Sequence, residues 1–432
     1  MISEQGKKFF KYVIPSVLAQ TIFAIYTMVD GFFVANYVSE TALGAVNISL
    51  PFISILFGIS VVFAIGTQTM CGVLLGRGNK EEASRVFTQS VLSLTIFSLI
   101  LGITSFLNMD KIAILLGARE DLIGLVENYL GIIMIFSPFF IISYNLEVLV
   151  KIDGYPYLSI IVVAISALTN IFLDYLFVAV YNYGIKGAAI ATGISQLLAT
   201  LIFLVHFLGK KSNLKFRTFK FHGNILKRIV HLGIGSCIAE IGGGAIIFLY
   251  NHFIINYLGE RALSTFTVIS YVTQMVAVFY AGISQGMSPL VSYYYGKNKL
   301  KEARTIFKYA LISTISVSLI SFGLINYFSQ NIFSVFLKGD LEQIIYSKGA
   351  MAKYSFSYLL IGYNIIISGF SASMLKPNNS IIINILRSFV MIGLALFLLS
   401  KINPQYIWFS SVLSEGLTLI FSLIVIKALL EN

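Results

Sequence analysis

The chain has 432 residues, of which 57% are hydrophobic and only 11% are charged, and its mean hydropathy is +0.86. Soluble domains carry about 25% charged residues, so this composition excludes a soluble protein and indicates a chain solvated mainly by lipid. The net charge of +11 does not indicate nucleic-acid binding in so apolar a chain, because basic residues of membrane proteins gather on one side of the bilayer. Cys71 and Cys237 both lie in apolar stretches, which excludes a disulfide framework and a CxxC metal site.

Apolar runs separated by polar breaks predict twelve transmembrane helices, since one span needs about 20 apolar residues. In chain order the predicted helices cover residues 12–38, 44–72, 88–107, 122–150, 157–181, 187–208, 231–258, 263–292, 306–328, 345–372, 380–400 and 404–429. The first of these runs continues past the length of a signal-peptide core and lacks a small-residue cleavage site, so we expect it to be retained.

A long basic break at residues 209–228 lies midway along the chain and is too polar for hydrocarbon. It predicts three parts: an N-terminal six-helix lobe at residues 1–208, a cytoplasmic basic linker at 209–228, and a C-terminal six-helix lobe at 229–432. If the N-terminus is cytoplasmic, 21 Lys and Arg residues fall on the cytoplasmic side and eight on the other. The positive-inside rule therefore predicts that both termini are cytoplasmic.

The two halves are related in sequence. Shifting the chain by 220 residues gives a gapless match from about residue 14 to residue 90. The matches place Ser16 on Ser236, Ala19 on Ala239, Asn36 on Asn256, Glu40 on Glu260, Gly66 on Gly286 and Gly76 on Gly296. Because each half has an even number of spans, both start on the same side, as parallel repeats do in some secondary transporters. The predicted fold is an all-α integral membrane protein of two parallel six-helix bundles.

Polar residues inside the first half predict a cation site. Ionisable groups in hydrocarbon cost roughly 2.5 to 3.5 kcal/mol, so each retained one indicates a function or a buried partner. At 1.5 Å per residue, Asp30 and Asp174 share one depth, Asn170 lies on the same face as Asp174, and Thr192 descends to a similar level. These hard oxygen ligands suit Na⁺ or a shared proton. The alternative is that the side chains only hydrogen-bond one another and hold the helices together.

The remaining intramembrane polar residues have alternative interpretations. Glu147 precedes Lys151 by one turn, which suits a snorkelling ion pair as well as a functional site. Arg387 and Glu415 are expected to pair across adjacent helices. A cationic-ligand role and a structural pairing are equally open for Glu240, and we assign substrate contact to Glu240, Gln274 and Tyr271. The chain shows no catalytic His or Cys constellation, so we expect no enzyme and no cofactor besides the coupling ion.

Six segments of the chain resemble the multidrug and toxic compound extrusion (MATE) family of transporters, prokaryotic type. They are VDGFFV (29–34), GRGNKEEASRVF (76–87), the G-x-P turn at 154–156, NIFLDYLF (170–177), GIKGAAIAT (184–192) and GKNKLKEARTIF (296–307). No single motif is decisive, but their order and their recurrence make the set specific. The likeness spans nearly the whole chain.

The resemblance implies a V-shaped pair of six-helix bundles that exports lipophilic, often cationic, drugs in exchange for Na⁺ or H⁺. The family's cation ligands match Asp30, Asn170, Asp174 and Thr192, and its helix 4 Asn corresponds to Asn145 or Glu147. Other branches of the family carry acids in the C-terminal lobe, where only Glu240 matches. We expect a monomer in a bacterial or archaeal plasma membrane, with small lipophilic molecules and lipid as partners. The alternative function is a flippase for a lipid-linked sugar or peptidoglycan precursor, which would need a basic cavity.

Overall fold

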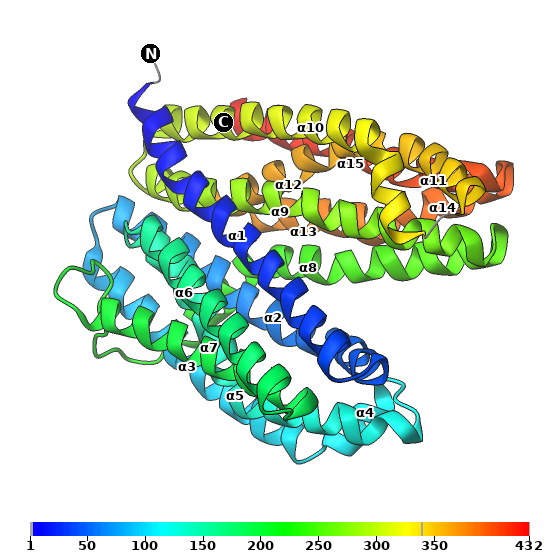
Figure 1. Cartoon of the computed structure of the whole chain (residues 1–432). Coiled ribbons are helices and arrows are strands. Elements are labelled where there is room, and N and C mark those ends of the chain that lie inside the picture. The colour runs from blue at the N-terminus through cyan, green and yellow to red at the C-terminus, as the bar shows by residue number, and fades with distance from the viewer. Residues whose placement is uncertain (1–2, 338–339, 432) are drawn as a thin grey trace. The chain divides into compact units, whose positions relative to one another are not determined.

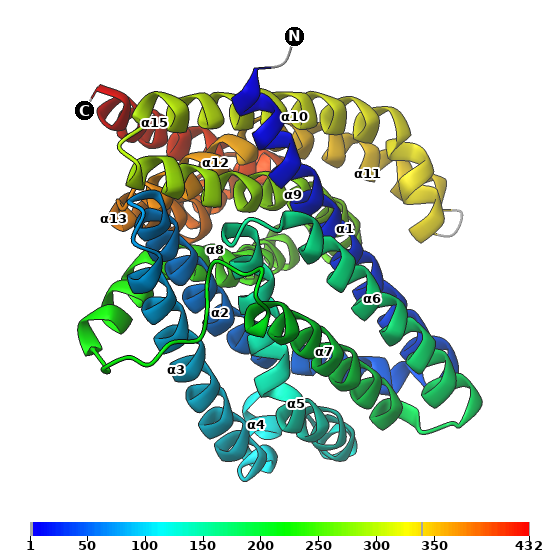
Figure 2. The ribbon, with the colours of Figure 1, turned by 90° about the vertical axis from the view of Figure 1, so that its left-hand side faces the viewer.

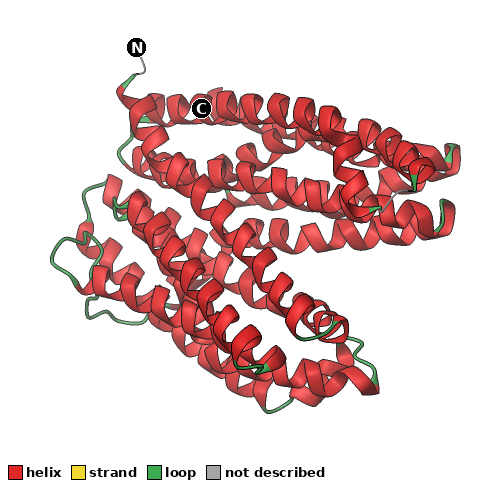
Figure 3. Cartoon of the chain, viewed as in Figure 1, coloured by secondary structure: helices red, strands yellow, loops and turns green. Residues whose placement is uncertain are grey.

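The computed structural model describes residues 3–337 and 340–431, and within that part the chain is helical and contains no strand (Figure 3). Twelve helical segments are long and apolar enough to cross a membrane, which confirms the predicted number of spans among the described residues. Several spans are made of more than one helical element, because π-helical or 3₁₀ turns interrupt them.

The chain divides into two compact units. The first, here called the N-lobe, comprises Ile14–Cys237 and Ser292–Lys299, and the second, the C-lobe, comprises Met1–Val13, Ile238–Val291 and Leu300–Asn432. Three helices contribute to both lobes: α1 (Glu4–Tyr37), α8 (Gly223–Tyr257) and α9 (Glu260–Gly296).

The N-lobe is built around a central helix. Its own elements are α2 (Glu40–Gly76), α3 (Lys80–Phe106), α4 (Met109–Leu115), α5 (Glu120–Ile152), α6 (Pro156–Asp174), the π-helical η1 (Tyr175–Val180) and α7 (Gly184–Leu208). Helix α5 packs against α2, α3, α6 and α7, and Figure 2 shows it beside α3, α4 and α7. Leu130, Ile141 and Leu146 of α5 are fully buried. Buried apolar residues on opposite faces of α5 suit this enclosed position.

The C-lobe has a corresponding central helix. Its own elements are α10 (Leu300–Phe336), α11 (Leu341–Tyr354), η2 (Ser355–Ser357), α12 (Tyr358–Ser373), α13 (Pro377–Ile385), η3 (Leu386–Val390), α14 (Met391–Ile402), η4 (Pro404–Phe409) and α15 (Ser410–Glu431). Helix α12 packs against α10, α13 and α15 (Figure 1, yellow to red). The aromatic side chains of Tyr250, Tyr280 and Trp408 are fully buried in the core of this lobe.

Several helices are longer than the apolar runs that predict them. Helix α1 begins at Glu4 and α3 at Lys80, where Asn79 caps the helix by accepting a hydrogen bond from the Glu82 amide at 3.1 Å. Apolar runs mark only the part of a helix that lies in hydrocarbon, whereas helical hydrogen bonding continues into the polar interface. The predicted linker is too long for the same reason: α8 starts at Gly223, so residues 223–228 are helical and the connecting loop covers 209–222.

Glycines allow α2 and α8 to approach closely within the N-lobe. A Cβ atom on Gly66 would overlap the carbonyl oxygen of Ile229, and one on Gly233 would overlap the carbonyl oxygen of Val62. Small residues at such crossings let helix backbones pack together. The first part of α8 is therefore bound to the N-lobe, and Gly286 in the C-lobe receives Val13 of α1 in the same way.

Candidate cation site

Three helices of the N-lobe bring the predicted cation ligands together. Asp30 comes from α1, Asn170 and Asp174 from the last turns of α6, and Thr192 from α7. The carboxyl groups of Asp30 and Asp174 lie within hydrogen-bonding reach of each other. The Asn170 amide nitrogen donates a hydrogen bond to Thr192 Oγ1 at 3.4 Å. Asp30 is 9% exposed, whereas Asn170 and Asp174 are fully buried.

Four oxygen atoms of this cluster have no hydrogen-bond donor. They are Oδ1 of Asp30, Oδ1 of Asn170, and both carboxylate oxygens of Asp174. A buried polar group without a partner is costly, and a buried charge is far more so. Two adjacent carboxylates therefore need a cation or a proton between them, and carboxylate and amide oxygens are the ligands that hard cations prefer. The donor set fits a small cation such as Na⁺, and it equally fits a shared proton.

The backbone changes form directly after Asp174. Helix α6 ends at this residue and continues as the π-helical η1. Short π-helical insertions in α-helices are frequent at functional sites, since they redirect side chains and carbonyl groups. The end of the regular helix thus coincides with the most buried carboxylate of the cluster, and this interruption was not predicted from the sequence.

The two candidates for a further ligand on α5 differ in their surroundings. Glu147 forms an ion pair with Lys151 at 2.8 Å, and the Lys151 side chain is fully buried. The ion pair was predicted as one of two alternatives. The expectation that Lys151 snorkels to the membrane interface is wrong, because its ammonium is buried inside the lobe. Asn145 is also fully buried, and neither its amide oxygen nor its amide nitrogen has a hydrogen-bond partner. Of these two side chains, Asn145 has an amide oxygen with no hydrogen bond or ion pair, whereas the Glu147 carboxylate is paired with Lys151.

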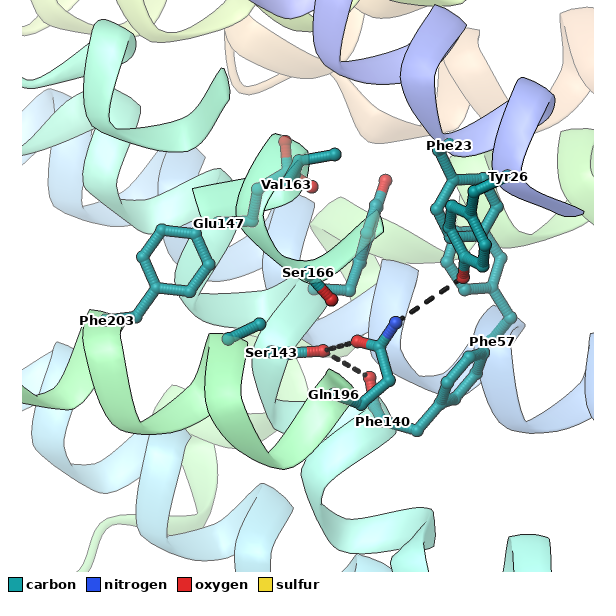
Figure 4. Close-up of a pocket in the computed structure, with 12 residues that line it drawn as sticks. Phe23, Tyr26, Phe57, Phe140, Ser143, Glu147, Val163, Ser166, Gln196 and Phe203 are labelled. Carbon is teal, nitrogen blue, oxygen red and sulfur yellow. Dashed lines mark hydrogen bonds between the residues drawn. The ribbon is translucent and has the colours of Figure 1, made fainter. Parts of the chain in front are cut away.

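A hydrogen-bonded chain next to the cluster was not anticipated from the sequence. Gln196 of α7 donates to the hydroxyl of Tyr26 at 3.4 Å, and the hydroxyl of Ser143 donates to Gln196 Oε1 at 2.6 Å (Figure 4). Tyr26 lies one helical turn before Asp30 on α1. None of the three hydrogen-bonded side chains carries a charge, so the rule that intramembrane charges mark functional sites does not identify them. The glutamine of GISQ (193–196), a polar residue within a predicted membrane span, could have indicated this hydrogen bonding.

The C-lobe candidates for substrate contact lie on two helices, Glu240 on α8 and both Tyr271 and Gln274 on α9. Glu240, Tyr271 and Gln274 are all exposed, and Tyr271 has its ring 6.3 Å from that of Phe336. The predicted pair of Arg387 and Glu415 is present, with Arg387 Nη2 at 2.7 Å from Glu415 Oε1.

The position related to Asp30 by the repeat is occupied by Tyr250, and it contains no carboxylate. The Tyr250 hydroxyl donates to Ser411 Oγ at 2.9 Å and accepts the Ser411 amide at 2.8 Å. Its ring is fully buried and stacks on Phe266. A satisfied aromatic side chain thus fills the place in the C-lobe that the carboxylates occupy in the N-lobe.

Comparisons with known proteins agree on one family. The chain matches the family model described as MatE over residues 15–176 and 245–397. It is 26% identical over 295 residues to the multidrug export protein MepA of Staphylococcus aureus, a match that covers 68% of this chain and 65% of that relative's length. It is 22% identical to MepA of Staphylococcus saprophyticus over 425 residues, which cover 98% of this chain and 93% of that relative. A solved structure described as the outward-facing conformation of a multidrug resistance MATE family transporter has 19% identity and a TM-score of 0.93. That match covers 100% of this chain and 98% of the other.

Proposed function

The chain belongs to the MATE family, and from that premise we propose that it is a secondary active exporter of lipophilic, mainly cationic compounds, driven by antiport of Na⁺ or H⁺ across the plasma membrane. The observation that carries the proposal is the cluster of four buried oxygen atoms without donors at Asp30, Asn170 and Asp174. The names of the MepA relatives, multidrug export proteins, support drugs as the substrate class.

The N-lobe cluster supplies the coupling step of this proposal. A cation that enters from outside binds between Asp30 and Asp174, and Thr192 and Asn170 complete its shell. Neutralising the two carboxylates removes their repulsion and lets α1 and the end of α6 pack more closely. The bound cation lowers the affinity for the exported compound. By linkage, the exported compound must weaken cation binding by the same factor, so each species promotes release of the other.

A lipid-linked sugar or peptidoglycan-precursor flippase is the second candidate, and the surroundings of Arg387 argue against it. Such a protein would need free basic side chains in its cavity to hold a pyrophosphate. The guanidinium of Arg387 is instead neutralised by Glu415 inside the C-lobe, with Nε at 3.1 Å and Nη2 at 2.7 Å from Glu415 Oε1. The lysine within the N-lobe, Lys151, is likewise paired with Glu147.

Uptake into everted membrane vesicles, in which export from the cytoplasmic face fills the lumen, tests the proposal. Uptake of a fluorescent lipophilic cation is measured with a Na⁺ gradient at fixed pH, and separately with a pH gradient and no Na⁺. We expect one of the two gradients to drive uptake by the wild type, and Asp30→Asn or Asp174→Asn to reduce it to the level of vesicles without the protein. Asp110→Asn is the matched control, because Asp110 is exposed at the start of α4. Gradient-driven uptake that survives in both Asn variants would refute the coupling role.

A further inference from the structure

A small, partly open cavity lies in the N-lobe beside the cation site. Its volume is about 40 Å³, and its polar lining residues are Tyr26, Ser143, Tyr144, Glu147, Ser166 and Gln196 (Figure 4). One buried water needs roughly 10 to 15 Å³ measured in this way, together with two to four polar partners. The cavity therefore has the room and the polarity for about two or three water molecules. All of its lining residues belong to the N-lobe.

One end of this cavity reaches the proposed coupling site. Tyr26 precedes Asp30 by one turn of α1, and its hydroxyl accepts the hydrogen bond from Gln196. Gln196 in turn accepts the hydrogen bond from Ser143. The hydrogen-bonded side chains therefore lead from Tyr26, one turn from Asp30, into the cavity, in the direction of the N-terminal end of α1 and the C-terminal end of α5.

One further polar group of the cavity is a carboxylate that is paired with a lysine. Glu147 lines the cavity and is 7% exposed, and Lys151 pairs with it one turn further along α5. Replacing a buried ion pair with apolar residues of similar volume is often neutral or stabilising. Stability alone therefore does not account for two charges at this depth of the lobe.

The repeat-related place in the C-lobe holds a buried ion pair. The turns after α5 and α12 both contain a residue with positive φ, Gly154 and Leu375, 221 residues apart, and this shift relates Ser143 to Asn364 and Ser166 to Arg387. Asn364 donates to Glu415 Oε2 at 2.7 Å, as Ser143 does to Gln196.

At these two related pairs of positions, the N-lobe has the smaller side chain, serine, where the C-lobe has asparagine or arginine. The carboxylate of Glu415 accepts hydrogen bonds from the guanidinium of Arg387 and from the amide of Asn364. In the N-lobe the place of Arg387 is taken by Ser166, whose hydroxyl donates to the Ser195 carbonyl at 3.0 Å. The repeat-related positions thus carry shorter side chains in the N-lobe, where the cavity lies.

We propose that the N-lobe cavity is a hydrated passage and that Glu147 is a second cation-binding site on it, from which the coupling ion leaves toward the cytoplasm. The inference rests on the proposed function as a cation-coupled exporter. A Na⁺ or proton released from Asp30 and Asp174 crosses the cavity and binds Glu147. Because the Lys151 ammonium is tethered one turn away, it competes for the same carboxylate and keeps the occupancy brief. The Asp30 cluster thus sets affinity, and Glu147 sets the rate of release.

Two double variants separate this role from a structural one. Glu147→Gln/Lys151→Met removes the ion pair of the N-lobe, and Glu415→Gln/Arg387→Met removes the ion pair of the C-lobe. Each protein is purified in detergent, its melting temperature is measured, and binding of radioactive sodium is compared with that of the wild type. If the coupling ion is a proton, proton release on substrate addition is followed with an indicator dye. Gradient-driven efflux is then measured in proteoliposomes.

We expect the N-lobe double variant to keep cation binding and to transport about tenfold more slowly, which is a barrier increase of about 1.4 kcal/mol. The C-lobe double variant is expected to transport at the wild-type rate. Ser166→Leu gives an independent test, because it fills the cavity without touching the ion pair, and the same slow efflux is expected.

Three outcomes would overturn the inference. The first is wild-type efflux in both the N-lobe double variant and Ser166→Leu, because neither Glu147 nor the open cavity would then matter for release. The second is loss of cation binding in the N-lobe double variant, because Glu147 would then belong to the first site. The third is a wild type that neither binds nor uses a cation. That result would refute the proposed function itself, and it is recognised before any variant is compared.

Discussion

Truncating Glu415 should destabilise the C-lobe far more than removing its whole ion pair. Glu415 accepts hydrogen bonds from Arg387 Nε at 3.1 Å, Arg387 Nη2 at 2.7 Å and Asn364 Nδ2 at 2.7 Å. The side chains of Arg387 and Glu415 are only 10% and 6% exposed, so solvent screens the pair little. In Glu415→Leu the guanidinium stays buried without its carboxylate.

Breaking a buried ion pair on one side costs about 3 to 5 kcal/mol. At about 2 to 4 °C per kcal/mol for a unit of this size, the melting temperature should fall by roughly 6 to 20 °C. In Arg387→Met/Glu415→Leu no charge is left unpaired, and we expect a stability within about 1 kcal/mol of the wild type.

The comparison is made by thermal unfolding in detergent, followed by tryptophan fluorescence, since Trp408 is fully buried in the core of this lobe. Titration with sodium dodecyl sulfate gives an independent measure of unfolding. A single variant that melts within 2 °C of the wild type would contradict the reasoning, because it would mean that water or another group compensates the guanidinium. A double variant as unstable as the single one would contradict it as well.

Further expectations concern helix packing, the linker and linkage. Gly233→Val should abolish expression of folded protein, because the new side chain would overlap the Val62 carbonyl. Gly243→Val on the same helix should be tolerated, because its Cβ meets open space. Size-exclusion profiles of the two variants distinguish these outcomes. Asp153→Ala should speed tryptic cleavage at Lys215 in the linker by about tenfold. The Asp153 carboxylate accepts hydrogen bonds from the backbone amides of residues 213 and 214 at 2.8 Å, and breaking such buried hydrogen bonds costs a few kcal/mol. Equal rates of cleavage of the variant and the wild type would contradict this. The coupling cation should raise the Kd of the exported compound in titration calorimetry, and a Kd that is the same with and without the cation would contradict antiport coupling.

The span number and the internal repeat could be predicted from the sequence. The spans depend on local composition, and the repeat depends on matching residues at a fixed offset. Runs of apolar residues identify membrane spans directly, and matched glycines such as Gly66 and Gly286 survive wherever two backbones must touch. Helix ends could not be placed as well, since hydrogen bonding continues beyond the apolar run, as at α8.

The proximity of the cation-site residues followed partly from helix geometry. Asn170 and Asp174 are one turn apart, and depth along the helices brings Asp30 and Thr192 to the same level. Their role in binding a cation stays a prediction. The contact between Gln196 and Ser143 and the cavity beside it could not be predicted, because they depend on which faces of α5 and α7 meet.

The division of α1 and α8 between the lobes has a consequence for how each lobe is completed. The part of α1 up to Val13 belongs to the C-lobe, where it packs on Gly286, and the start of α8 belongs to the N-lobe, where it packs on Gly66. Each lobe is therefore completed by the first turns of a helix whose remainder belongs to the other lobe. A chain cut at the loop 209–222 would separate each lobe from the segment that covers its glycine.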